Sequence, residues 1–129
     1  MLKRTGTIAA FLLILLGVAL SFIYIVSPEL DFDADEAIVG LMAIHITKGH
    51  IPAYYYGQGY MGSLEALMAG IYFLLFGVGI SSLRLAPLSF YLLFLIFQYK
   101  LIRDFKDGKH AILTLLLSVI FSPTMILWA

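Results

Sequence analysis

The stretch DFDADEA, residues 31–37, lies between two hydrophobic segments and decides how the rest of the chain is interpreted. With Glu29 just before it, this stretch holds five of the eight acidic residues of the protein. Carboxylates this close together must face water, and they repel one another unless a cation, a base or a substrate group lies between them. Two interpretations stay open: a catalytic or metal-binding loop, and a solvated acidic loop outside a membrane.

The composition indicates an integral membrane protein. Of the 129 residues 62% are hydrophobic and only 12% are charged, whereas ordinary globular chains are about 45–50% apolar. The formal net charge is zero, which gives no reason to expect nucleic acid as a partner. The absence of cysteine excludes disulfides and thiolate metal sites.

The first hydrophobic segment, residues 8–26, follows Lys3 and Arg4. A signal peptide has an apolar region of only ~7–15 residues followed by a cleavage site, whereas this segment is close to the ~20 residues of a spanning helix. We therefore predict an uncleaved anchor. Its N-terminus is expected in the cytoplasm, because basic residues favour that side, and the acidic stretch then lies outside.

A helix is predicted over residues 34–48. Asp33 and Glu36 have the spacing of a capping box, Gly49 suits the position just after a helix, and Pro52 forbids continuation. The helix is too short to cross a bilayer, so we expect it to lie along the outer membrane surface. The positive end of its dipole keeps the carboxylates near its N-terminus ionised.

The loop YYYGQGYMG, residues 54–62, follows this helix. Its four tyrosines are suited to stacking on sugar rings or gating a substrate cleft, and they are equally typical of an aromatic belt at the lipid headgroups. Its three glycines indicate a tightly folded loop. Of the histidines, we expect His45 to pack on its helix face, His50 to be solvated and His110 to lie at the cytoplasmic interface.

The basic loop at residues 100–110 decides the topology, because it holds four of the eight basic residues and the positive-inside rule assigns it to the cytoplasm. This requires that the glycine-interrupted segment 66–83 dips into the membrane or lies along its surface instead of crossing. We therefore predict an all-α integral membrane fold, a single membrane domain over residues 1–129. The predicted spans are about 8–26, 85–102 and 111–128, and the outer loop, about 27–84, carries juxtamembrane or re-entrant helices.

Several short motifs follow one another in a recognisable order. An outer loop with Asp35-Glu36-Ala37 opening a helix comes first, and then Gly49-x-x-Pro52, Tyr56-Gly57-Gln58, Leu75-Phe76-Gly77 and Leu83-Arg84-Leu85. This order resembles the N-terminal third of GT-C-type membrane glycosyltransferases, above all the protein mannosyltransferase and aminoarabinose transferase-like group of bacteria and archaea. The chain departs from that group in having Gly59-Tyr60-Met61-Gly62 in place of a His-Pro-Pro-like turn, and in lacking the later spans and the C-terminal soluble domain.

The resemblance implies a transferase that moves a hexosyl or pentosyl group from a polyprenyl-phosphate carrier to an acceptor, at the outer face of a prokaryotic cytoplasmic membrane. It implies Asp35 as the general base, with Glu36 as its catalytic neighbour. A divalent cation on Asp33 and Asp35 would offset the charge of the leaving phosphate. The candidate substrate-binding residues are Arg84, Glu65, Tyr56 and Gln58.

Other interpretations stay open beside this one. Glu65 and Arg84 also suit positions at the lipid headgroups, where they would have no catalytic part. The chain as a whole also fits a small stand-alone membrane protein that assembles with a partner or regulates it. Its apolar end at Trp128-Ala129 favours the fragment interpretation. As a fragment it is expected to be inactive alone and to need membrane lipid, the carrier-linked sugar and the remainder of the enzyme, which could be a separate chain.

Overall fold

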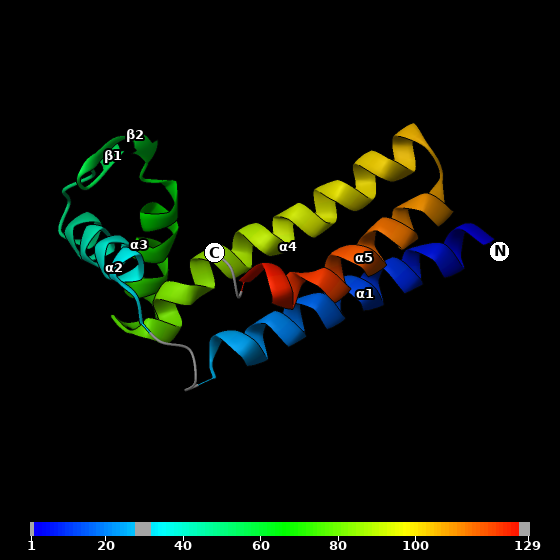
Figure 1. The fold of residues 1–129 in the computed structure, drawn as a ribbon, viewed down its shortest axis with the longest axis horizontal. Helices are drawn as coiled ribbons and strands as arrows, with labels where there is room; N and C mark the ends of the chain where they lie inside the picture. The colour runs from blue at the N-terminus through cyan, green and yellow to red at the C-terminus, as the bar shows by residue number, and fades with distance from the viewer. Residues whose placement is uncertain (1, 28–31, 127–129) are drawn as a thin grey trace. The chain divides into compact units, whose positions relative to one another are not determined.

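The computed structural model describes residues 2–27 and 32–126, and over these residues the chain is mostly helical (Figure 1). The elements in chain order are α1 (Leu2–Ile25), α2 (Ala34–Thr47), β1 (Tyr54–Tyr55), β2 (Gln58–Gly62), α3 (Leu64–Phe76), α4 (Ile80–Phe105) and α5 (Gly108–Ile126). The short β-hairpin departs from the predicted all-α fold. Glu29 and Asp31 of the acidic stretch lie outside the described residues, as do Trp128 and the side chains of Lys3 and Arg4.

The chain divides into two compact units. The first comprises Met1–Tyr24 and Leu88–Ala129, and the second comprises Ile25–Pro87. The bounds of the second unit lie close to those predicted for the outer loop, residues 27–84. The acidic stretch, the hairpin, α2 and α3 therefore belong to one folded body, which also includes the first turns of α4.

The first unit is a bundle of α1, α4 and α5, which run side by side (Figure 1). Its buried cluster contains Ala10, Leu95, Tyr99, Ala111 and Leu115. Gly17 permits α1 to approach α5 closely, because a Cβ at this position would lie 2.8 Å from Val119 Cγ2 of α5. Gln98 and Ser118 satisfy each other across the bundle with two side-chain hydrogen bonds, 2.9 and 3.0 Å long.

Two helices of the described chain are long and apolar enough to cross a membrane: residues Gly6–Ile23 of α1, and α4. The apolar helices Leu64–Phe76 and Gly108–Phe121 are shorter. The first two predicted spans thus fall on helices of sufficient length, and the third, 111–128, falls on α5. Length and apolar composition are the membrane signals here, and buried helices of soluble proteins and signal sequences share them.

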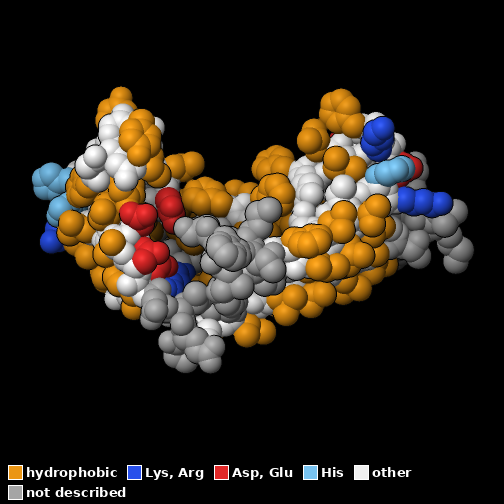
Figure 2. Space-filling view, viewed as in Figure 1, with side chains coloured by type: hydrophobic (Ala, Val, Ile, Leu, Met, Phe, Trp, Pro, Cys, Tyr) orange, Lys and Arg blue, Asp and Glu red, His pale blue; other side chains and the backbone are white. Residues whose placement is uncertain are grey.

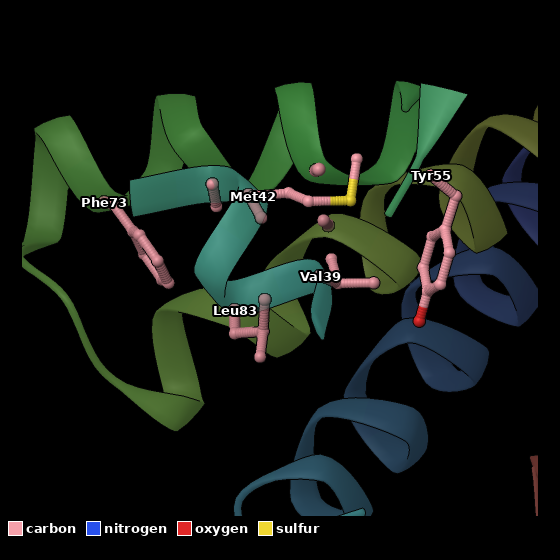
Figure 3. Close-up of a cluster of buried hydrophobic side chains, with 9 residues drawn as sticks. Val39, Met42, Tyr55, Phe73 and Leu83 are labelled. Atoms are coloured by element: carbon pink, nitrogen blue, oxygen red, sulfur yellow. The ribbon is translucent and has the colours of Figure 1, made fainter. Parts of the chain in front are cut away.

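The second unit has its core where α2 packs against α3. Met42 and Ala43 of α2 and Ala69 of α3 are fully buried, and Leu83 from the start of α4 packs onto the same cluster. Figure 3 shows Val39, Met42, Phe73 and Leu83 gathered between the helices, with Tyr55 at the edge of the cluster.

The prediction of α2 and of both its ends is confirmed. Asp33 is the N-cap, and its Oδ1 accepts a hydrogen bond of 2.7 Å from the Glu36 backbone N–H. At the other end Gly49 has a φ of +89°, and the N–H groups of Gly49 and His50 donate to Ile46 and His45. This is the Schellman arrangement, in which glycine adopts the left-handed conformation at low cost.

The segment 66–83, which is interrupted by glycines in the sequence, is divided between two helices. Helix α3 ends at Phe76, since Gly77 has a φ of +87° that breaks the helical path, and α4 begins at Ile80. As a consequence Leu83 and Arg84 lie in the first turns of α4.

The hairpin consists of the strands β1 and β2, which meet across a two-residue turn. Tyr55 pairs with Gln58, and the turn at Tyr56 and Gly57 uses a φ of +83° at Gly57. The buried Ser63 closes the base of the hairpin by donating its hydroxyl to the Pro52 carbonyl, with an O–O distance of 2.5 Å. The predicted tight loop is therefore a β-hairpin attached to α2 and α3.

Candidate functional site

The first turn of α2 brings three carboxylates of the acidic stretch into different environments. Acidic side chains gather on one part of the second unit (Figure 2). Asp33 and Asp35 are exposed, whereas Glu36 is half-buried, and Asp33 is engaged as the helix cap. These residues are close in sequence but contact different partners. Their carboxylates therefore differ in how readily they can react with another molecule.

Glu36 is held by Arg84 in a bidentate ion pair. Arg84 Nε donates to Glu36 Oε1 at 2.7 Å, and Nη2 donates to Oε2 at 2.8 Å. Arg84 is only 6% exposed, and its Nη1 donates to the Ile25 carbonyl at 3.2 Å. Planar two-point pairing of this kind is the strong form of the arginine–carboxylate interaction. The Glu36 carboxylate therefore makes this pair in place of the return bond of the capping box.

This pairing bears on the predicted roles of Arg84 and Glu36. The sequence suggested Arg84 as a substrate-binding residue or as a residue at the lipid headgroups, and the structure pairs it with the Glu36 carboxylate. A phosphate contact would require Arg84 to leave Glu36 while buried, which costs free energy. The geometry thus favours Arg84 and Glu36 as residues that hold the site together.

Asp35 has no such cation on it among the interactions described. The Tyr55 hydroxyl donates toward it, 3.2 Å from the Asp35 backbone oxygen and 3.4 Å from Oδ1. Burial raises the pKa of the Tyr55 phenol, and the charge of Asp35 raises it further. The phenol consequently stays neutral and can act as a donor, while the exposed Asp35 carboxylate can still accept a proton from another molecule.

Glu65, at the start of α3, lies close enough to Glu36 for the two charges to interact. Its side chain is exposed overall, yet nearby protein atoms displace part of its hydration, and this desolvation raises the pKa of Glu65. The charge of Glu36 raises that pKa further. The structure thus brings Glu65 toward the same group of residues as Asp35, Glu36 and Arg84.

The other two predicted substrate-binding residues lie on the hairpin. The Tyr56 hydroxyl is 2.7 Å from His45 Nδ1, near the C-terminal end of α2. His45, which the sequence predicted to pack on its helix face, thus contacts the turn of the hairpin. Gln58 is half-buried at the start of β2, paired in register with Tyr55. Tyr56 is thus engaged at the opposite end of α2 from Asp35.

Asp33 and Asp35 were also predicted to bind a divalent cation. Within the described part of the chain, no three His, Cys, Asp or Glu side chains lie close enough together to hold a metal ion. The remaining acidic residues of the stretch, Glu29 and Asp31, lie outside that part. The cation therefore stays a prediction that depends on residues beyond these two aspartates.

Tyr55 is the residue of the site that the sequence did not single out. Tyr55 is the last residue of β1 and Tyr56 lies in the turn, and the contacts of both with α2 depend on how the hairpin packs onto that helix. The run of tyrosines carries no apolar–polar contrast, and therefore no signal in it distinguishes the buried one from the others.

In comparisons with protein-family models, with curated proteins and with solved structures, nothing matches this chain.

We predict that Arg84 and Glu36 depend strongly on each other for stability. Either Glu36→Met or Arg84→Met alone should lower the free energy of unfolding by roughly 2–4 kcal/mol, because each change removes one half of a mostly buried bidentate ion pair. The double variant should lose clearly less than the sum of the two. Chemical unfolding in detergent, with amide hydrogen exchange in α2 as the local measure, tests this.

The control is the exposed pair of Arg103 and Asp104, whose side chains are 47% and 67% exposed. Asp104→Asn should change the stability by less than about 0.5 kcal/mol, because water screens such a pair. Additive losses in the Glu36 and Arg84 variants, or losses no larger than that of the control, would contradict the account of the buried pair.

We also predict a pH-dependent effect of Glu65. Its pKa in the folded chain is raised above the ordinary value of 4.5, so the folded chain holds this proton more tightly than the unfolded chain. The resulting stabilisation is complete below that ordinary value and is lost as the pH rises through the raised pKa. Glu65→Gln keeps a neutral side chain at every pH, so it should melt at a higher temperature than the unaltered chain near neutral pH and equally at low pH.

Asp107 provides a control of opposite sign, because hydrogen bonds from His110, first of all its backbone N–H, lower the pKa of Asp107. Asp107→Asn should therefore lower the melting temperature near neutral pH and lose its effect in acid. Melting temperatures of both variants over a pH series test the signs. A Glu65→Gln variant that is less stable than the unaltered chain near neutral pH would refute the assignment.

Proposed function

We propose that this chain is the N-terminal part of a membrane glycosyltransferase that moves a sugar from a polyprenyl-phosphate carrier to an acceptor, at the outer face of a prokaryotic cytoplasmic membrane. In this proposal Asp35 is the general base. The proposal is supported by the ordered motifs of the sequence and by one geometric observation, the different engagement of Asp35 and Glu36 at the start of α2.

That observation separates the roles of two neighbouring carboxylates. Both oxygens of Glu36 accept hydrogen bonds from the buried Arg84, so taking up a proton there would disrupt an ion pair. Asp35 is exposed, and among the described residues its carboxylate is contacted by the Tyr55 hydroxyl at the longer distance of 3.4 Å. A general base must reach the proton that it removes, which favours Asp35.

The reaction that follows is a substitution at the anomeric carbon. An acceptor hydroxyl or amine attacks that carbon, the bond from the carbon to the phosphate oxygen breaks, and the polyprenyl phosphate leaves with the electron pair. Asp35 takes the proton of the acceptor. A divalent cation, in the proposal, offsets the charge that develops on the phosphate.

The membrane arrangement is part of the proposal. α1 and α4 are long enough to cross, and we propose α5 as the third span, which leaves the second unit outside and the 100–110 loop in the cytoplasm. Helix α3 has 13 residues, about 20 Å at 1.5 Å per residue, which is shorter than the ~30 Å hydrocarbon core. Its exposed apolar residues Leu74, Leu75 and Phe76 support a position at the membrane boundary.

We predict that Asp35→Asn lowers turnover by about 10²–10⁴-fold, the usual contribution of a general base. The assay uses membranes that contain the complete gene product and follows the consumption of polyprenyl-phosphate mannose and of polyprenyl-phosphate aminoarabinose as separate donors. Binding of the donor should change little, because Asp35 acts on the proton of the acceptor.

Asp33→Asn is the matched control, since asparagine caps a helix about as well as aspartate and removes the same charge two residues away. It should retain most of the turnover if Asp33 acts as the cap alone, and lose it if Asp33 binds the cation. Turnover by Asp35→Asn close to that of the unaltered protein would overturn Asp35 as the base. No consumption of either donor by the unaltered protein would count against these donor sugars.

A further inference from the structure

Two neighbouring tyrosines attach the hairpin to opposite ends of α2. Tyr55 reaches Asp35 in the first turn of the helix, and Tyr56 reaches His45 near its last turn. Tyr55 is the last residue of β1 and Tyr56 is the first residue of the turn, where the chain reverses, so the two adjacent side chains contact different places. The hairpin therefore fixes not only the position of α2 but also the surroundings of one particular carboxylate.

The ring and the hydroxyl of Tyr55 have separate roles. The residue is 8% exposed, and its ring packs in the same cluster as Val39 and Met42 (Figure 3). The hydroxyl lies at the far end of the ring, and its single O–H is shared between two acceptors of Asp35, the backbone oxygen at 3.2 Å and Oδ1 at 3.4 Å. The packed ring gives the hydroxyl a fixed position, because a phenol has no further rotatable bond that could move its oxygen.

We propose that Tyr55 is a positioning residue that holds the Asp35 carboxylate in one orientation, with Oδ1 on the phenol and Oδ2 directed to the acceptor. The orientation itself is inferred from the contact geometry. Its catalytic consequence rests on the proposed function. An exposed aspartate without such a donor changes between side-chain rotamers. Proton transfer needs the carboxylate oxygen within hydrogen-bond reach of the acceptor, so a fixed orientation increases the rate.

The first test measures the orientation without any turnover. In the 129-residue chain labelled with ¹³C-aspartate, the infrared bands of unaltered protein and Asp35→Asn are subtracted to identify the Asp35 carboxylate. Tyr55→Phe keeps the ring but removes the hydroxyl, so the Asp35 band should shift and broaden. Tyr56→Phe removes a hydroxyl from the adjacent residue and should leave that band unchanged.

The second test measures turnover of polyprenyl-phosphate sugar in membranes with the complete gene product. Tyr55→Phe should lower turnover by roughly 10–100-fold, the range expected for a misplaced catalytic group. In the Asp35→Asn background, Tyr55→Phe should have no further effect on the residual turnover, because Tyr55 acts only through Asp35. A residue that merely stabilised the fold would lower turnover in both backgrounds.

The possible outcomes separate this inference from the proposed function. An Asp35 band that is unchanged in Tyr55→Phe overturns the positioning role alone, and so does an equal loss of turnover in both backgrounds. If Asp35→Asn retains full turnover, Asp35 is not the general base, and that part of the proposed function fails, whatever the infrared result. If the Tyr55→Phe chain unfolds, Asp35→Glu serves as the second variant. It keeps a carboxylate one methylene beyond the reach of the phenol, and retained full turnover there would also overturn the inference.

Discussion

The second unit depends on one ion pair, that of Arg84 with Glu36. The guanidinium is almost fully buried, and it joins three segments that are distant in sequence: the end of α1 through the Ile25 carbonyl, the first turn of α2 through Glu36, and the first turns of α4 from which it extends. A buried guanidinium left without its carboxylate would be strongly unfavourable. The pair therefore fixes where α2 begins, and with it where the acidic stretch presents its side chains.

This constraint has a chemical consequence. Because Arg84 engages Glu36 at both oxygens, the neighbouring Asp35 is left as an exposed carboxylate, next to the phenol of Tyr55. Glu65 adds a third carboxyl group whose proton is held more tightly than usual. A reaction that needs a single general base requires one accessible carboxylate whose neighbours are in different surroundings. The acidic residues here meet that requirement, whereas the carboxylates of a uniformly solvated loop would all have the same surroundings.

The sequence predicted those parts of the fold that depend on local chemistry. Asp33 and Gly49 determine the two ends of α2 through contacts within a few residues, so spacing alone was sufficient. The glycines of the segment 66–83 were recognised as interruptions, but Gly77 was not identified as the residue that ends α3. The partner of Arg84 lies 48 residues away, and the buried face of Tyr55 depends on α2, so neither could be read from spacing.

In the proposed topology the second unit lies outside the membrane, as the part of the chain that follows α1 and precedes the membrane-spanning part of α4. Because the chain has no native cysteine, single cysteines report position without background. In intact cells, an impermeant thiol reagent should label Ala34→Cys from outside, and should label Gly108→Cys only after the cells are permeabilised. Labelling of Gly108→Cys in intact cells, or of Ala34→Cys only after permeabilisation, would contradict the account.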